Sequence, residues 1–131
     1  MTQITEDFVS LETAKLLKEK GFDAPVKNYY SLYTEDVKHN LQKKYGAKKN
    51  WNSFDLTISR PSQSLVMKWL REVHMIFIRP NINFLYPIRY YCEIFCYGDN
   101  LKTQQDVTTE RFESPEEACE AAIKYCLENL I

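Results

Sequence analysis

The hydrophobic pattern changes its period at His74, and this change constrains the fold more than any other feature. Apolar residues over 65–73 recur at the spacing of one helix face. From His74 the pattern changes to that of strands: a short strand is expected over 75–78, a long one over 88–97 and a third over 107–112. The connections are short, and tight turns join antiparallel strands only. The sequence therefore predicts a helix followed by an antiparallel meander.

Two further helices are expected near the ends of the chain. Ser10 is a suitable N-cap for the first helix, and Gly21 suits the left-handed position just beyond its end. In the last helix, Ser114 and Glu117 have the spacing of a capping box, with Pro115 in the first turn. The residues that should face the core from this helix are Cys119, Ala122, Ile123, Cys126, Leu127 and Leu130.

The remaining segments predict two strands, a turn and one ambiguous stretch. Residues 28–33 are rich in aromatics, and 54–58 alternate with Phe54 and the other apolar side chains inward, so both predict strands. Residues 79–87 hold two prolines and predict a turn, while 34–50 fit a short helix or a basic loop. The expected order is α-β-(α or loop)-β-α-β-β-β-α. We therefore expect an α+β fold with one antiparallel sheet of about four or five strands and helices mainly on one face.

Length and composition indicate one self-sufficient domain over 1–131. Hydrophobic residues make up 44% and charged residues 27% of the 131 positions, close to the averages of globular proteins. The net charge of −1 provides no general attraction to nucleic acid or to an anionic membrane. No apolar run reaches the length of a membrane helix, and the opening residues do not resemble a signal peptide. A cytoplasmic protein without a membrane partner is expected.

The four cysteines fit a core better than a metal site. Zinc sites usually hold tight pairs such as C-x2-C, whereas Cys92 and Cys96 are separated by three residues and Cys119 and Cys126 by six. These spacings place each pair among inward apolar residues, where free cysteine is common. We expect free thiols in the core, no metal and no cofactor; a metal or redox site is the less favoured alternative.

No residue pattern assigns a catalytic or cofactor-binding residue. The three glycines stand far apart, at 21, 46 and 98, so neither of the common phosphate-binding loops is present. His39 and His74 belong to no paired histidine motif and to no nucleophile–base pattern. A small enzyme without a recognisable motif is therefore only the third functional hypothesis.

One face of the long strand is the first candidate surface for a partner. If Cys92 and Ile94 point toward the helices, then Tyr91, Phe95 and Tyr97 point away from them. Such a face is too apolar to remain bare. Another segment of the chain, a second copy or a ligand would cover it, and coverage within the chain or self-association is favoured. The leading hypothesis is thus a non-enzymatic interaction protein, homodimeric through this face.

The basic and aromatic segment over 38–51 is the second candidate surface. Lysines neutralise phosphates and aromatic rings stack on unpaired bases, which makes single-stranded nucleic-acid binding the alternative function. A solvated lysine loop anchored to the core by Trp51 explains the same residues without a ligand. The residues that would contact nucleic acid are Lys43, Lys44, Tyr45, Lys48, Lys49 and Trp51.

Three segments, 61–74, 9–22 and 112–130, resemble segments of small proteins, with no assigned activity, that phages and prophages of gut bacteria encode. The central segment 61–74, PSQSLVMKWLREVH, carries the most specific similarity. Residues 9–22 resemble the opening of those proteins, and 112–130 resemble their closing helix. The resemblance implies an accessory role for a mobile element in the host cytoplasm, and it assigns no site residue.

Overall fold

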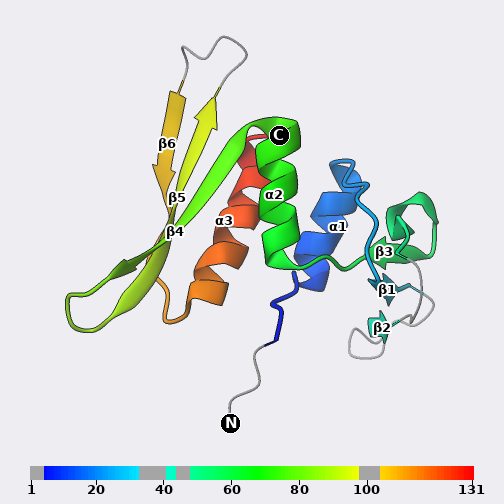
Figure 1. Ribbon diagram of the computed structural model, residues 1–131, viewed down its shortest axis with the longest axis horizontal. Helices are drawn as coiled ribbons and strands as arrows, with labels where there is room; N and C mark the ends of the chain where they lie inside the picture. The colour runs from blue at the N-terminus through cyan, green and yellow to red at the C-terminus, as the bar shows by residue number, and fades with distance from the viewer. Residues whose placement is uncertain (1–4, 33–40, 44–47, 98–103) are drawn as a thin grey trace. The chain divides into compact units, whose positions relative to one another are not determined.

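The computed structural model describes residues 5–32, 41–43, 48–97 and 104–131 (Figure 1). It confirms the α+β class, with three α-helices among these residues. The chain divides into two compact units, Met1–Ser62 and Gln63–Ile131, and the single self-sufficient domain over 1–131 stays a prediction. The expectation of a single sheet is wrong, because the strands form two antiparallel sheets of three strands, one in each unit. No helix within the described ranges is long and apolar enough to cross a membrane.

The first unit contains the predicted N-terminal helix and a small sheet of order β2-β1-β3. Ser10 caps the helix by accepting a hydrogen bond from the Thr13 amide at 3.2 Å, and Gly21 follows the helix end with φ +88°. Both ends are therefore as predicted. The ambiguous stretch 34–50 lies largely outside the described residues, although it includes a short strand. The elements are α1 (Leu11–Glu19), β1 (Asn28–Ser31), β2 (Leu41–Lys43), the 3-10 helix η2 (Trp51–Ser53) and β3 (Thr57–Ser59).

The strand expected over 54–58 is displaced toward the C-terminus. It begins at Thr57, and the side chains of Phe54 and Leu56 are 51% and 45% exposed rather than inward. The reason is a turn that follows η2. The Lys18 ammonium, at the end of α1, donates hydrogen bonds to the carbonyls of Phe54 at 2.7 Å and Thr57 at 2.9 Å, which holds this turn in place. Local alternation contains no information about this contact between distant residues.

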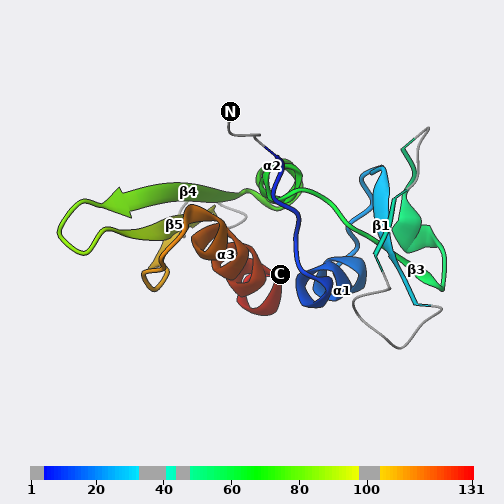
Figure 2. The same ribbon diagram turned by 90° about the horizontal axis from the view of Figure 1, so that it is seen from below.

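The second unit is the predicted helix and meander, followed by the C-terminal helix. Its sheet has the order β4-β5-β6, and α3 packs against β4 and β5 (Figure 2). Ser114 caps α3 by accepting from the Glu117 amide at 3.2 Å, and Pro115 is its first residue, as predicted. The expected inward stripe of α3 is buried, apart from the half-buried Leu130. The elements are α2 (Gln63–His74), β4 (Ile76–Asn83), β5 (Arg89–Tyr97), β6 (Gln104–Thr108) and α3 (Pro115–Asn129).

The first strand of the meander is longer than predicted. A turn was expected from Arg79 onward, but β4 continues through Pro80 to Asn83. Pro80 is tolerated because β4 is an edge strand. Cys92, which lies opposite Pro80 on β5, directs its backbone N–H and carbonyl away from β4, toward Thr109. The Cys92 amide donates to Thr109 Oγ1 at 2.9 Å, and its carbonyl accepts from the Thr109 amide at 2.9 Å. The missing N–H of proline therefore leaves no bond of the ladder unmade.

Met75 occupies a backbone conformation that favours glycine. It follows the last residue of α2, has φ +56° and is 45% exposed. We predict that Met75→Gly raises the free energy of unfolding by about 1 kcal/mol, because the left-handed conformation costs a residue with a Cβ about that much. Lys68→Gly in the exposed interior of α2 is the matched control and should lower it by about 1 kcal/mol. Urea unfolding measures both changes, and a destabilised Met75→Gly would contradict the prediction.

Candidate protein-interaction site

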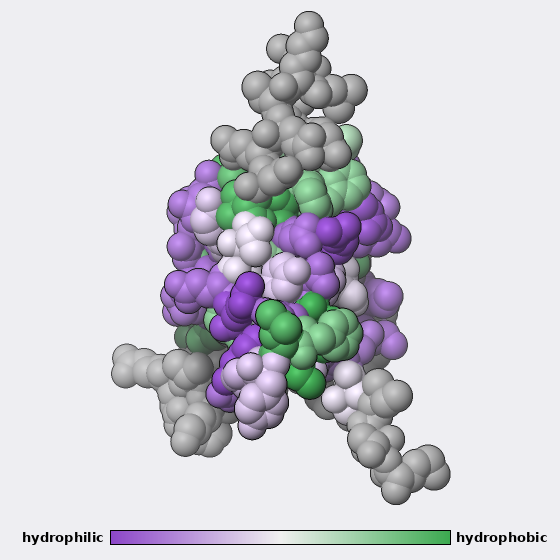
Figure 3. Space-filling model, turned by 90° about the vertical axis from the view of Figure 1, so that its left-hand side faces the viewer, coloured by the Kyte–Doolittle hydropathy of each residue, from purple (hydrophilic) through white to green (hydrophobic). Residues whose placement is uncertain are grey.

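The turn between β4 and β5 exposes five consecutive apolar or aromatic residues, Phe84–Ile88, which we call the hairpin tip (Figure 1). Phe84 and Leu85 are 78% and 76% exposed, Tyr86 is 97% exposed and Ile88 is 48% exposed. Figure 3 views this side and shows hydrophobic side chains gathered in its lower half. The tip exposes on the order of 500 Å² of surface, since an aromatic side chain presents about 150–250 Å². Apolar patches of this size on a monomer are often functional.

Two backbone polar groups of the hairpin tip form hydrogen bonds with side chains of the hairpin itself. The Leu85 amide donates to Asn83 Oδ1 at 3.0 Å, and the Ile88 carbonyl accepts from Arg89 Nη1 at 2.9 Å. Pro87 has no N–H group to satisfy. These groups would otherwise raise the cost of moving the tip from water into an apolar environment. The tip is thus suited to burial in a partner.

Acidic side chains flank the base of the hairpin. Tyr90 and Phe112 exchange backbone hydrogen bonds of 2.8 and 2.7 Å, which places the segment 110–117 alongside the hairpin two residues from the tip. This segment carries four exposed glutamates against two flanking arginines, Arg89 and Arg111, an excess of two negative charges. Two of these glutamates also lie in the first turn of α3, where negative charge stabilises a helix. The glutamates are Glu110, Glu113, Glu116 and Glu117.

The sheet face selected from the sequence is more polar than the hairpin tip. Tyr91 and Phe95 are half-buried and alternate with the buried Cys92 and Ile94, as predicted, while the side chain of Tyr97 lies outside the described residues. Between the two rings stands Glu93.

Glu93 is fixed in place by neighbours on the adjacent strand. Its carboxylate accepts from the Arg79 guanidinium at 2.6 Å and from the Asn81 amide at 2.9 Å. The hydrogen bond from Arg79, followed by that from Asn81, lowers the pKa of Glu93 below its usual value. The Arg79 guanidinium also lies 5.5 Å from the centre of the Phe95 ring. A partner at this face would have to accommodate a charged network.

The basic and aromatic segment presents its lysines but not its tryptophan. Lys48 and Lys49 are exposed, whereas Trp51 is only 7% exposed. The Trp51 indole N–H donates to the Val26 carbonyl at 2.9 Å, and its ring stacks on Tyr29 with 4.2 Å between centroids. This is the anchoring role that the sequence offered as the alternative to base stacking. The other three predicted contact residues are not described at side-chain level: Lys43, in β2, and Lys44 and Tyr45, outside the described residues.

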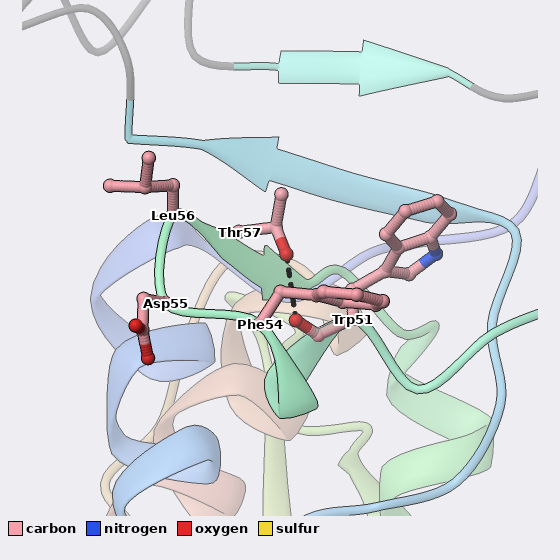
Figure 4. A pocket seen from close by; sticks show the side chains of 5 residues that line it. All are labelled: Trp51, Phe54, Asp55, Leu56 and Thr57. Atoms are coloured by element: carbon pink, nitrogen blue, oxygen red, sulfur yellow. Dashed lines mark hydrogen bonds between the residues drawn. The ribbon is translucent and has the colours of Figure 1, made fainter.

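A shallow depression of about 320 Å³, which we call the loop depression, lies beside the turn after η2 (Figure 4). It is lined by Trp51, Phe54, Asp55, Leu56 and Thr57. Exposed Phe54 and Leu56 contribute much of its apolar wall, and Asp55 is its one acidic lining residue. Thr57 Oγ1 donates to the Trp51 carbonyl at 2.7 Å and helps to hold the turn. The Lys49 ammonium lies 5.8 Å from the centre of the Trp51 ring. The depression is therefore apolar, with positive charge nearby.

The cysteines are core residues, as predicted. All four are free; Cys92, Cys119 and Cys126 are buried, and Cys96 is half-buried. The sulfur atoms of Cys92 and Cys119 lie 4.0 Å apart, and this contact together with burial raises the pKa of Cys92. Burial raises the pKa of Cys126 to about 12. No group of three or more histidine, cysteine or acidic side chains among the described residues is arranged to hold a metal ion.

These thiols should be unreactive in the folded protein. Since the thiolate is the nucleophile, we predict that iodoacetamide at pH 8 modifies Cys96 first and Cys92 and Cys126 only after unfolding. The same reaction in concentrated urea, where all four should react, is the control. Mass spectrometry of tryptic peptides measures the order, and early modification of Cys126 in the native protein would contradict this assignment to the core.

The hairpin tip is the surface that the sequence analysis missed. Its residues were assigned to a turn, because of the prolines, and to the start of a strand. A signal was nevertheless present, since 84–88 is a run of five apolar or aromatic residues within a predicted turn. Turns are usually polar, and an exposed run of three or more apolar residues is unfavourable in a soluble fold unless it has a function.

Comparison of the chain with protein-family models, with curated proteins and with solved structures gives no match.

Proposed function

We propose that this chain is a non-enzymatic interaction protein that binds another protein through the hairpin tip. The observation that carries the proposal is the exposure of Phe84, Leu85 and Tyr86, each more than three-quarters accessible at the end of a hairpin. The energetic centres of protein interfaces are enriched in aromatic residues surrounded by a polar rim. The tip offers such a centre, with the polar side chains of Asn83 and Arg89 on either side.

The charge around the tip favours a protein over a phosphate-rich partner. The glutamates of 110–117 would repel both nucleic acid and an anionic membrane at the base of the hairpin. For the basic segment, stacking of a base on Trp51 would require the indole to leave its contacts with Val26 and Tyr29. Single-stranded nucleic-acid binding and enzymatic activity therefore remain predictions from the sequence that we rank below protein binding.

The outer face of β5 is the second surface that we propose for contact with a protein. A homodimer through Tyr91, Phe95 and Tyr97 would pair this face with itself across a two-fold axis. The ion pair between Arg79 and Glu93 makes the face less apolar than the hairpin tip, which is why we place the tip first. An accessory role for a phage or prophage, which the sequence resemblance implies, is compatible with either surface.

Site-specific photocrosslinking in the native host cell tests the proposed function. A photoreactive phenylalanine analogue replaces Tyr86, and the same analogue replaces exposed Lys68 on α2 as the matched control. We expect a discrete protein adduct from position 86 and none from position 68. No adduct at position 86, lipid adducts alone, or the same adduct pattern from both positions would overturn the proposal.

A further inference from the structure

We propose that the partner of the hairpin tip is a second copy of this chain, whose loop depression receives the tip. The inference rests on the proposed function and names the partner of the same site. The tip belongs to the second unit and the loop depression to the first, so each copy carries one of each. The contact is formed between copies and joins two different surfaces.

The two surfaces match in polarity. The loop depression is largely open to solvent, and its volume of about 320 Å³ gives room for one large side chain of the tip. Tyr86 is the most exposed aromatic of the tip, and Leu85 lies beside it. Phe54 and Leu56 are themselves large apolar side chains that are about half exposed at the depression. Joining the surfaces would remove apolar area from water on both sides, which is the main driving force of association.

The charges around the two surfaces are also complementary. Glu110, Glu113 and the two glutamates at the start of α3 leave the hairpin side with an excess of negative charge. Exposed Lys48 and Lys49 leave the side of the depression with an excess of positive charge, which Asp55 reduces only in part. Opposite potentials of this kind orient two partners before contact and select against the wrong partner. The arrangement favours a second copy over an anionic lipid surface.

A contact between two different surfaces has a consequence for assembly. When the tip of one copy binds the depression of another, the resulting pair still has one free tip and one free depression. Further copies can therefore add until a ring closes or an open chain of copies forms. A homodimer through the outer face of β5 would instead stop at two copies. Assembly size therefore separates the two modes of self-association.

Sedimentation of the full chain, alone and in mixtures, tests this inference. The tip variant carries Leu85→Ser and Tyr86→Ser, and the depression variant carries Phe54→Ser and Leu56→Ser. All four positions are at least 45% exposed, so both variants should keep the circular dichroism spectrum of the wild-type fold. We expect the wild-type chain to form species larger than a dimer as its concentration rises. Each variant alone should be monomeric, with association at least ten-fold weaker than that of the wild type.

The decisive sample is a mixture of the two variants. The depression variant keeps an intact tip and the tip variant keeps an intact depression, so the mixture should form a dimer with one chain of each kind and nothing larger. Raising the salt concentration should weaken this dimer, because exposed charges are screened. Phe95→Lys, on the outer face of β5, should leave it unchanged.

Four results would overturn the inference. One is a wild-type chain that stays monomeric at high concentration. Another is a wild-type dimer that persists in both variants and is lost in Phe95→Lys, which would assign self-association to the sheet face. The third is a tip that binds vesicles of phosphatidylcholine, alone or mixed with anionic phosphatidylserine, while the mixture of variants stays monomeric. A crosslink from position 86 to a different protein, with no crosslink to this chain, would also end the inference and would still support the proposed function.

Discussion

Replacing Trp51 with alanine is expected to lower the free energy of unfolding by about 3–5 kcal/mol, the usual cost of removing a buried aromatic side chain. Trp51 is 7% exposed, donates its indole N–H to the Val26 carbonyl and stacks on Tyr29. The substitution therefore removes apolar contacts and one of the two hydrogen bonds that the Val26 carbonyl accepts, the other coming from the Lys49 amide at 3.0 Å. Urea unfolding followed by circular dichroism measures the change without relying on the fluorescence of the removed residue.

Two matched variants separate the contributions of Trp51. Trp51→Phe keeps an aromatic ring but loses the hydrogen bond to the Val26 carbonyl, which still accepts from the Lys49 amide, so it should cost about 1 kcal/mol. Phe54→Ala, at a neighbouring residue that is half exposed, should cost less than Trp51→Ala. A loss below about 1 kcal/mol in Trp51→Ala would contradict the anchoring role and would favour a ring available for base stacking.

Ile94→Ala is expected to lower the free energy of unfolding by about 2–5 kcal/mol. Ile94 is fully buried on the face of β5 that α3 covers, so the shorter side chain leaves a cavity in the core of the second unit. Its neighbour Phe95 points to the other face and is only half-buried. Phe95→Ala removes more atoms and should nevertheless cost less. Urea unfolding of both variants measures this order.

The order of these two costs decides which face of the sheet is packed. If Phe95→Ala were as costly as Ile94→Ala, the outer face would be as tightly packed as the core. That result would contradict the assignment of Tyr91 and Phe95 to an outer, partly accessible face. A smaller cost for Phe95→Ala than for Ile94→Ala would agree with an outer face that is accessible to a partner.

Helices were predictable from the sequence because their signals are local. Ser10 and Ser114 accept the amide hydrogen bonds expected of N-caps, and Gly21 adopts the positive φ expected beyond a helix end. The burial of the inward face of α3 follows from spacing alone. The meander β4-β5-β6 was also predictable, because short connections can join antiparallel strands but not parallel ones.

The errors in the fold arise from contacts between residues that are distant in sequence. The strand β3 begins late because Lys18 holds the turn before it, and no pattern near Phe54 contains that contact. The strand β4 continues through Pro80 because it is an edge strand, and edge positions are known only when the sheet order is known. The separation of the strands into two sheets likewise depends on tertiary pairing.

The candidate site was predictable only in part. Alternation correctly placed Tyr91 and Phe95 on the face of β5 opposite the buried one. It did not reveal that Glu93, which lies between these two residues, forms an ion pair with Arg79 of β4. The hairpin tip was assigned to a turn and the start of a strand because proline marks a turn without indicating the exposure of its neighbours. The apolar run around Tyr86 was visible in the sequence, and the structure adds its nearly complete exposure.

The mass spectrum of the molecule that becomes attached at position 86 tests the central claim most directly. The photoreactive analogue at this position lies at the most exposed side chain of the hairpin tip. Our account predicts that the attached molecule is a peptide from a binding partner. Attachment of lipid alone, or analogue that has reacted only with solvent, would contradict the account.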